Sequence, residues 1–149
     1  MELDPDELLK LESQVCFGVA VASRSVISAY RPVLEPLGLT HPQYLVMLAL
    51  WEQAPIGARE LSSLLHLDPG TLSPLVKRLE SHGLVARRRN PADERAILIE
   101  LTETGMALRE RALGVPLEMM RRLQLDEQDV RDIQRLMDKL IQAASDAGD

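Results

Sequence analysis

Hydrophobic residues recur at helical spacing over most of this chain, and this pattern predicts a mainly helical protein. Asp4 and Pro5 together form a helix start, because aspartate can cap a helix and proline suits its first position. From there apolar residues follow every three or four positions until Pro32. They predict a single first helix over residues 5–31, about 26 residues long. A helix of this length in a small chain needs a partner surface, so we expect it to take part in a homodimer.

Two shorter helices are predicted next. Thr40 and Gln43 have the spacing of a capping box, in which each side chain bonds to the backbone of the other residue. They precede an apolar helix over residues 44–51. The following helix is predicted over residues 57–66. Its inward-facing side chains are expected to be Leu61, Leu64 and Leu65.

A further helix begins at Asp68-Pro69 and has two distinct faces. Gly83 stands where a glycine commonly ends a helix. One face is an apolar stripe made by Leu72, Leu75, Val76 and Leu79. The opposite face is polar and presents Thr71, Ser73, Pro74, Lys77, Arg78 and Ser81. Taken alone, such a polar face is most simply a solvated helix surface.

The pattern then changes to the two-residue period of strands, over residues 85–89 and 96–101. Between them lies a polar turn over residues 90–95, so the two strands form a hairpin. The residues expected to alternate toward the core are Ile97, Ile99 and Leu101.

The last third of the chain returns to helical periodicity. Thr102 is expected to cap a helix that Pro116 interrupts, and Asp126 to cap the last helix. We therefore predict one domain over residues 1–149, mainly α with a small β-hairpin wing. Its winged helix-turn-helix spans about residues 41–101. Dimerisation helices are expected over residues 5–31 and 103–145.

Composition and charge add a partner to this picture. Aromatic residues make up only 3% of the chain, so aliphatic side chains must fill the core, as suits helices packed on helices. Residues 57–95 hold seven basic and five acidic residues, a net charge of +2. The rest holds 10 basic and 18 acidic residues, a net charge of −8. A basic stripe on an acidic protein predicts binding to double-stranded DNA.

Other classes of protein are disfavoured. No apolar run reaches the roughly 20 residues of a membrane span, and the acidic N-terminus does not resemble a signal peptide. One cysteine cannot form an internal disulfide, which favours a reducing cytoplasm. We expect neither a cofactor nor an enzymatic activity, since no nucleophile-base-acid constellation is visible. No metal site is expected either, because the histidines lack ligand spacing; they are His41, His66 and His82.

The predicted elements suggest specific DNA contacts. A recognition helix enters the major groove with its N-terminal end, where short hydroxyls meet base edges and cations reach the backbone. Pro74 is awkward inside a helix, and a function at that position would explain it. The candidates for the major groove are Thr71, Ser73, Lys77 and Arg78, flanked by Pro74. Candidates for the minor groove are Arg95 and Asp93, with Asp93 bracing the Arg95 guanidinium by a paired hydrogen bond. Those for phosphates are Arg87, Arg88 and Arg89.

The order of elements resembles that of MarR-type winged-helix regulators, and Asp93-Glu94-Arg95 is similar to their wing motif. More narrowly, the chain resembles the organic hydroperoxide sensors of that superfamily, the OhrR branch, in its one-cysteine form. The segments that carry this resemblance are Gln14-Val15-Cys16-Phe17, Tyr30-Arg31-Pro32, Gly38-Leu39-Thr40-His41-Pro42-Gln43-Tyr44 and Leu67-Asp68-Pro69-Gly70-Thr71-Leu72.

The resemblance implies a cytoplasmic homodimeric repressor that binds a pseudo-palindromic operator while its cysteine is reduced. Oxidation by an organic hydroperoxide would then release the DNA. Transferred by position, Cys16 is the redox sensor, and Tyr30 matches a tyrosine that hydrogen-bonds the sensor of the other subunit. Two positions depart from the family pattern, since His41 and Ala20 stand where some members carry tyrosine. The sensor site is therefore expected to be less rich in tyrosine, with His41 as a second hydrogen-bond partner.

The chemistry of a lone thiol constrains this reading. A free thiol has a pKa of about 8.5, so fast reaction with a peroxide needs nearby donors or positive charge. Tyr30 lies 14 residues from Cys16, about 21 Å along a helix, so only an antiparallel second chain can bring it close. His41, at a helix start, should favour its neutral form. With no second cysteine, Cys16 would become a sulfenic acid and then a mixed disulfide with a low-molecular-weight thiol, or an overoxidised acid.

Two other functions remain open at this stage. The chain can instead be a MarR-type repressor released by a small aromatic or phenolic ligand, with Cys16 as part of the core. It can also be a thiol peroxidase, although that reading leaves the basic hairpin unexplained. A gel shift of wild type and Cys16→Ser with and without peroxide separates these possibilities.

Overall fold

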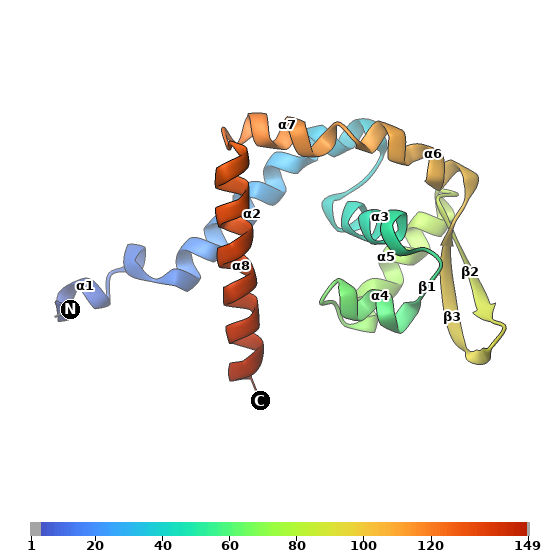
Figure 1. Ribbon diagram of the computed structural model, residues 1–149, viewed down its shortest axis with the longest axis horizontal. Coiled ribbons are helices and arrows are strands. Elements are labelled where there is room, and N and C mark those ends of the chain that lie inside the picture. Colours follow the sequence, from blue (N-terminus) through green and yellow to red (C-terminus); the bar gives the residue numbers. More distant parts are fainter. Residues whose placement is uncertain (1–3, 149) are drawn as a thin grey trace. The chain divides into compact units, whose positions relative to one another are not determined.

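The structure is a computed structural model that describes residues 4–148 (Figure 1). Its internal contacts divide the chain into two compact units, Met1–Val115 and Pro116–Asp149, and each is described by itself. The single domain expected from the sequence stays a prediction. None of the helices in the described part is long and apolar enough to cross a bilayer.

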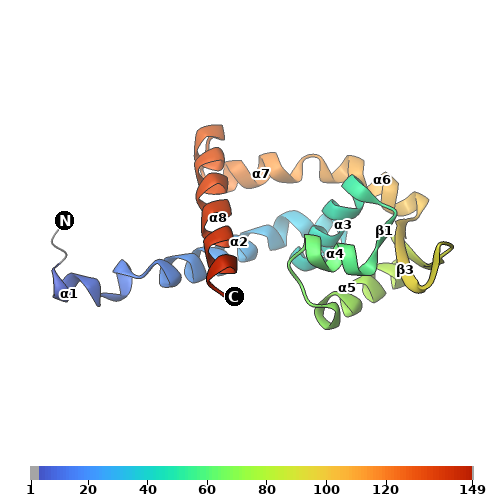
Figure 2. The ribbon, with the colours of Figure 1, turned by 60° about the horizontal axis from the view of Figure 1, so that its bottom comes forward.

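The first unit is mostly helical with one small sheet, in agreement with the predicted fold class. Figures 1 and 2 show α3, α4 and α5 gathered beside the strands. In chain order its elements are α1 (Pro5–Leu8), η1 (Leu11–Ser13), α2 (Val15–Leu34), η2 (Glu35–Leu37), α3 (His41–Gln53), β1 (Ile56–Gly57), α4 (Ala58–Leu64), α5 (Pro69–Ser81), β2 (Val85–Asn90), β3 (Asp93–Leu101) and α6 (Glu103–Ala112).

The core of this unit is aliphatic and lies where α3, α4 and α5 meet the sheet. The apolar stripe predicted for α5 is confirmed, because Leu72, Val76 and Leu79 are buried and Leu75 is partly buried. Burying a leucine or valine side chain contributes roughly 1.5–3 kcal/mol, so this stripe is a main attachment of α5 to the lobe. The other large side chains that are fully enclosed include Leu34, Met47, Leu50, Leu61, Val85 and Ile99.

The sheet has three antiparallel strands in the order β1-β3-β2. In the hairpin, Val85 pairs with Leu101 and Arg87 pairs with Ile99. The short strand β1 adds to the other edge of β3, with Ile56 opposite Ile99. The sequence did not predict β1, since two residues are too few to show an alternating pattern.

The predicted first helix is wrong as a single element. The structure has α1, the short η1 and then α2, which begins at Val15. The predicted cap is confirmed, because the Asp4 side chain accepts a hydrogen bond from the backbone N–H of Asp6. Gln14 has extended backbone, and its side-chain amide donates to the carbonyls of Leu8 and Lys10. These bonds satisfy carbonyls at the end of the preceding turns in place of a continuing helix.

The end of this region also differs from the prediction. The helix α2 continues through Pro32 to Leu34 instead of ending at residue 31. A proline in the last turn removes only one intrahelical hydrogen bond, and Leu34 is fully buried, so packing outweighs that loss.

Two further details of the predicted helices change. The helix predicted over residues 57–66 is the shorter α4, because Gly57 pairs in β1 and His66 has a left-handed φ of 53°. Leu61 is buried as predicted, Leu65 is partly buried, but Leu64 is 42% exposed and does not face the core.

The turn of the wing is tighter than predicted. The strands extend to Asn90 and Asp93, so only two residues, Pro91 and Ala92, separate them. Ile99 is buried and Leu101 partly buried, whereas Ile97 is 41% exposed. The predicted alternation therefore holds near the lobe and fails toward the tip, where the hairpin extends beyond the core.

The helix α6 is joined closely to the start of the wing. Thr102 caps it as predicted, accepting from the N–H of Gly105, and its hydroxyl donates to the carbonyl of Gly83. A Cβ on Gly105 would lie 2.0 Å from the carbonyl oxygen of Leu84, so no larger residue fits there without a backbone shift. The indole N–H of Trp51 in α3 donates to the Gly105 carbonyl at 2.9 Å.

The helix α7 (Val115–Arg122) starts just before Pro116, so the predicted interruption is confirmed; the break falls at residues 113–114. In the second unit, Asp126 and Asp129 form a capping box that begins α8 (Glu127–Ala147). The apolar stripe of α8 is largely exposed to solvent. Its exposed members are Ile133, Leu136, Met137, Leu140 and Ile141.

Candidate nucleic-acid interface and thiol site

The helix α5 presents the polar face that the sequence predicts for a recognition helix. Its cap is Asp68, whose carboxylate accepts from the backbone N–H of Thr71 at 3.0 Å and from the Thr71 hydroxyl at 2.9 Å. These hydrogen bonds from Thr71 lower the pKa of Asp68, so a fixed negative charge lies at the start of the helix. All six predicted residues of this face are exposed, namely Thr71, Ser73, Pro74, Lys77, Arg78 and Ser81.

The hydroxyls on this face differ in their freedom to meet a ligand. The Thr71 hydrogen is donated to Asp68, which leaves its oxygen as an acceptor. The Ser81 hydroxyl donates to the carbonyl of Lys77 at 3.0 Å. Pro74 lies inside the helix and is exposed, so its ring takes part in the outer surface of α5 and not in the core.

The three consecutive arginines of β2 have different surroundings. Arg87 forms an ion pair with Glu80 of α5 at 3.0 Å, and Arg88 forms one with Glu100 of β3 at 2.9 Å. Arg89 has no ion pair within residues 4–148. The sequence identified the three arginines but not their partners, because Glu80 and Glu100 become neighbours only through the turn after α5 and the register of the hairpin.

At the tip of the wing, side chains hold the turn. The Asn90 side chain accepts from the N–H of Ala92 at 2.9 Å. Asp93 accepts from the backbone N–H of Arg95 at 3.1 Å. The predicted bracing of the Arg95 guanidinium by Asp93 is therefore wrong in this structure: Asp93 instead fixes the backbone beside Arg95.

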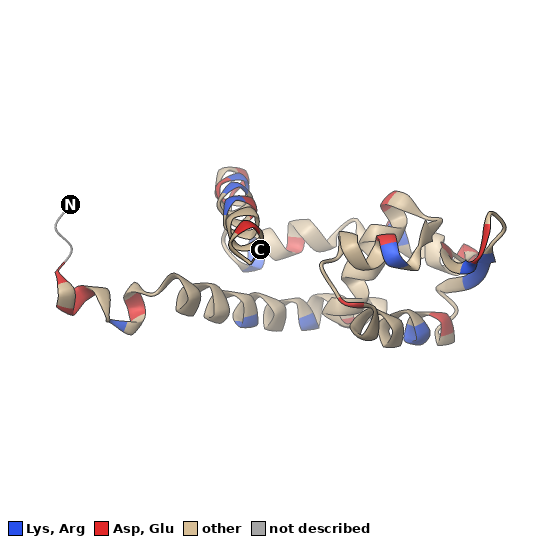
Figure 3. Ribbon diagram, turned by 90° about the horizontal axis from the view of Figure 1, so that it is seen from below, with Lys and Arg blue, Asp and Glu red and all other residues tan. Residues whose placement is uncertain are grey.

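Figure 3 shows basic segments on the wing and on the helical lobe beside it, interspersed with acidic ones, and mixed charge along α8. The arrangement agrees with the charge separation found in the sequence.

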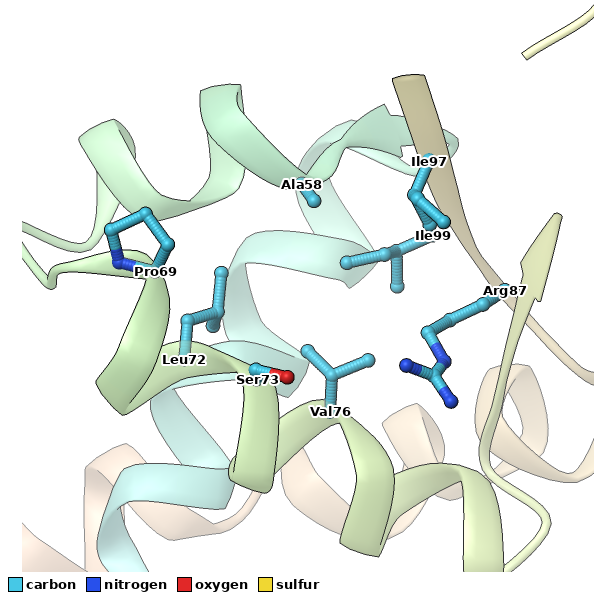
Figure 4. Close-up of a pocket in the computed structure, with 8 residues that line it drawn as sticks. All are labelled: Ala58, Pro69, Leu72, Ser73, Val76, Arg87, Ile97 and Ile99. Atoms are coloured by element: carbon cyan, nitrogen blue, oxygen red, sulfur yellow. The ribbon is translucent and has the colours of Figure 1, made fainter. Parts of the chain in front are cut away.

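A small apolar pocket of about 290 Å³ lies between α4, α5 and the wing (Figure 4). The side chain of Arg87 extends from β2 toward α5 beside this pocket. The other lining residues are Ala58, Pro69, Leu72, Ser73, Val76, Ile97 and Ile99.

Cys16 lies in the first turn of α2 and its side chain is exposed. Neighbouring positions on this helix are also exposed and apolar, among them Val15, Phe17 and Val21. A thiol on an uncovered apolar helix surface can be reached by a small oxidant or covered by a second chain.

Tyr30, near the other end of α2, belongs to a cluster of three rings. Its ring centroid is 4.9 Å from that of His41 and 5.9 Å from that of Tyr44. Burial raises the pKa of Tyr30, so the phenol keeps its proton, and burial lowers the pKa of His41, so the imidazole is neutral. The neutral form predicted for His41 is thus supported, with burial as its cause. Sequence reasoning did not assign Tyr44 to this cluster.

A second pocket of about 680 Å³ lies next to this cluster, between α2, α3 and α5. Arg78 and His82 from the end of α5 line it together with His41 and Thr40. Residues near the ring cluster and residues of the predicted recognition helix therefore share one pocket. Within residues 4–148 no group of three histidine, cysteine, aspartate or glutamate side chains is arranged to hold a metal ion.

The helices α3, α4 and α5 with the adjacent basic hairpin define a winged helix-turn-helix, a fold class that binds duplex DNA. A family model described as transcriptional regulator SarA/Rot matches residues 28–111. The organic hydroperoxide resistance transcriptional regulator of Bacillus subtilis (strain 168) is 41% identical over 132 residues, which cover 89% of this chain and 88% of that protein.

Solved structures agree with this assignment. Reduced AbfR bound to DNA superimposes with a TM-score of 0.82 at 30% identity, over 96% of this chain and 98% of AbfR. Overoxidised AbfR, also bound to DNA, gives a TM-score of 0.74 at 32% identity, over 94% and 99% of the two chains. CouR from Rhodococcus jostii RHA1 bound to p-coumaroyl-CoA gives 0.76 at 27% identity, over 89% and 94%.

The chain belongs to the MarR-type winged-helix transcriptional regulators, and the predicted resemblance to their organic hydroperoxide sensor branch is confirmed. It is a DNA-binding transcriptional regulator.

Proposed function

We propose that this regulator is a homodimeric repressor that acts in the cytoplasm and senses organic hydroperoxides through oxidation of Cys16, which releases its DNA. The observation that carries the proposal is the exposed Cys16 thiol on α2. It occurs in a chain that is 41% identical, over nearly its whole length, to an organic hydroperoxide resistance regulator.

The ring cluster supplies the donors that such a thiol needs. Tyr30 is protonated and His41 neutral, so each can donate a hydrogen bond to a thiolate or to a developing oxyanion. Cys16 and Tyr30 lie 14 positions apart in α2, about 21 Å along the axis, so the sulfur must meet the Tyr30 of a second chain. The donors are therefore proposed to act between subunits.

The chemistry balances with two small reactants. The Cys16 thiolate attacks one oxygen of the hydroperoxide, the O–O bond breaks, and the alkoxide takes a proton to leave as an alcohol. Cys16 is then a sulfenic acid. A low-molecular-weight thiol attacks its sulfur, a mixed disulfide forms, and water leaves. Because overoxidised AbfR has been crystallised on DNA, we favour the bulkier mixed disulfide over further oxidation as the releasing form.

Residues that contact DNA are proposed from their exposure and position. The major-groove candidates Thr71, Ser73, Lys77 and Arg78 share the outer face of α5, around Pro74. Arg95, at the wing tip, is proposed for the minor groove, with Asp93 fixing the backbone beside it, and Arg89 is proposed for a phosphate. A dimer would place two such surfaces about one helical turn apart, roughly 34 Å, on a pseudo-palindromic operator.

A gel-shift titration tests the sensor. The probe is a duplex selected by the reduced wild-type protein from a randomised pool, and cumene hydroperoxide is added with and without a small thiol. We expect wild type to leave the duplex and Cys16→Ser to stay bound. Mass spectrometry of the released protein should show an adduct on Cys16. Release of DNA with Cys16 unmodified, or retention of DNA with Cys16 fully converted to the adduct, would falsify the proposal.

The pocket of about 680 Å³ supports a second candidate function, release by a small ligand. CouR, which has the same fold, has been crystallised with p-coumaroyl-CoA. In this alternative a small aromatic or phenolic compound occupies the pocket, and Cys16 has only a structural role. The discriminating result is a Cys16→Ser protein that leaves DNA with a phenolic acid or its thioester and ignores peroxide.

A further inference from the structure

We infer that Glu80 and Arg87 form a positioning pair that sets the wing relative to the recognition helix, and that Arg87 is not a phosphate contact. The Glu80 carboxylate accepts three hydrogen bonds from this one residue. They come from the Arg87 backbone N–H at 3.3 Å, from Nε at 3.3 Å and from Nη2 at 3.0 Å. The fork of the guanidinium is thus matched to both carboxylate oxygens, which fixes direction as well as distance.

The pair links the end of the recognition helix to the start of the wing. Glu80 lies in the last turn of α5 and Arg87 near the start of β2, on either side of a tight connection. There Gly83 takes a left-handed φ of 74°, and the N–H of Leu84 returns to the carbonyl of Leu79 at 3.0 Å. The ion pair links the two elements that this connection joins. The end of α5 and the start of β2 are thus held together by a backbone hydrogen bond and by side chains.

The pocket beside the pair explains why a restraint is needed. The space between α5 and the hairpin holds about 290 Å³ and is not filled by side chains (Figure 4). The exposure of Ile97 shows that the outer half of the wing has few core contacts. Packing alone therefore leaves the hairpin free to change its angle to α5, and the Arg87 side chain crosses the gap.

The three arginines of β2 consequently have separate roles. Arg88 is bound to Glu100 across the hairpin, at a neighbouring position that faces the other side of the sheet. Arg89 carries no ion pair within the described residues and lies nearest the tip. It is the member of the three whose charge is available to a phosphate.

Glu80 is an acidic residue on the predicted recognition helix, where a negative charge is unfavourable for DNA binding. Glu80 is ionised at neutral pH, because hydrogen bonds from Arg87 lower its pKa. A negative charge close to the duplex repels phosphates and weakens binding. An exposed ion pair also adds little to stability. The remaining use of Glu80 is geometric: it orients Arg87, and with it the wing.

The charge of Glu80 makes the inference testable, because charge and geometry predict opposite signs. Glu80→Gln removes a negative charge near DNA, so electrostatics alone predicts tighter binding. Loss of the positioning pair predicts weaker binding, by roughly two- to fivefold. Arg87→Lys keeps the positive charge and loses the fork, so it should weaken binding similarly. Affinities are measured by fluorescence anisotropy with the selected duplex and the reduced protein, in the absence of peroxide.

Salt dependence and a charge reversal provide the controls. Arg89→Gln, as a lost phosphate contact, should lower the slope of log affinity against log salt by about one, whereas Glu80→Gln should leave the slope unchanged. The double variant Glu80→Arg with Arg87→Glu should bind more tightly than either single change. Equal or tighter binding by Glu80→Gln, with full affinity in Arg87→Lys, would overturn the inference. The inference rests on DNA binding alone, so its failure leaves the Cys16 proposal untouched.

Discussion

The protonation states of Tyr30 and His41 follow from their partial burial in the ring cluster. His41 packs against Tyr30, and both side chains are partly buried. Burial disfavours the charged imidazole, so the pKa of His41 lies below its usual value. The cluster is therefore a set of neutral donors at neutral pH.

The lowered pKa of His41 predicts how stability changes with pH. Its folded-state pKa lies below the unfolded value of about 6.5, so the folded protein binds fewer protons in that interval. The contribution of the neutral His41 to stability is therefore fully present above the unfolded pKa. It is lost as pH falls through the folded pKa. Urea unfolding at about pH 7.5 and about pH 5.5 should therefore show a smaller difference for His41→Gln than for wild type.

The exposed His82 provides a matched control for this experiment. His82→Gln removes an exposed imidazole that lies outside the ring cluster, and the variant should keep the pH dependence of the wild type. A His41→Gln protein whose two unfolding free energies differ as much as those of wild type would contradict the argument.

At the scale of elements, local chemistry determined what the sequence could predict. The caps Asp4, Thr40, Asp68, Thr102 and Asp126 were all identified, because a capping side chain bonds within three residues of itself. The break before α2 was missed, since it depends on hydrogen bonds from Gln14 and not on a breaking residue. The strand β1 was missed because it exists only through pairing with β3.

Among the site residues, too, features set by local sequence could be predicted, whereas features that depend on tertiary contacts could not. The exposed face of α5 followed from helical spacing, and the lone cysteine from the composition. The pairing of Arg87 with Glu80 did not follow, because it depends on the path of the chain through Gly83. The ring contact between Tyr30 and Tyr44 likewise required the packing of α2 on α3.

The contact of α6 with the start of the wing leads to a prediction at this scale. Gly105→Ala would place a Cβ 2.0 Å from the Leu84 carbonyl oxygen, a backbone atom that cannot move alone. We expect a loss of about 1–3 kcal/mol or more in the free energy of unfolding, measured with urea. The matched control is Gly114→Ala, where nothing lies within 4 Å and the change should stay within about 0.5 kcal/mol. Equal stability of the two variants would show that α6 does not pack on the wing in this way.

At the scale of the whole molecule, two helices leave apolar surface uncovered. The helix α2 exposes Val15, Phe17 and Val21, and α8 exposes a stripe that includes Leu136 and Ile141. Stripes of this size are costly in water unless another surface covers them. They support the proposed homodimer, and the proposed sensor site requires one, because Cys16 cannot reach the Tyr30 of its own chain.

A charge in the α8 stripe should therefore dissociate the proposed dimer. Leu136→Glu buries a carboxylate without a partner, and we expect the dissociation constant to rise at least about tenfold. Sedimentation equilibrium measures this directly, and operator affinity should fall in parallel. The control Gln128→Glu adds the same charge on the polar face of α8, where it can still accept from Arg131. An unchanged dimer in Leu136→Glu would exclude α8 from the interface.

The hydrogen bond between Trp51 and Gly105 has a practical consequence. Trp51 is the only tryptophan in the chain, and its indole lies where α3 meets the base of α6. The tryptophan fluorescence of the unlabelled protein therefore comes from one known position, the contact between α3 and α6. A shift of that fluorescence when Cys16 is oxidised would report, in real time, a movement at the contact between α3 and α6. An unchanged spectrum would place the movement elsewhere.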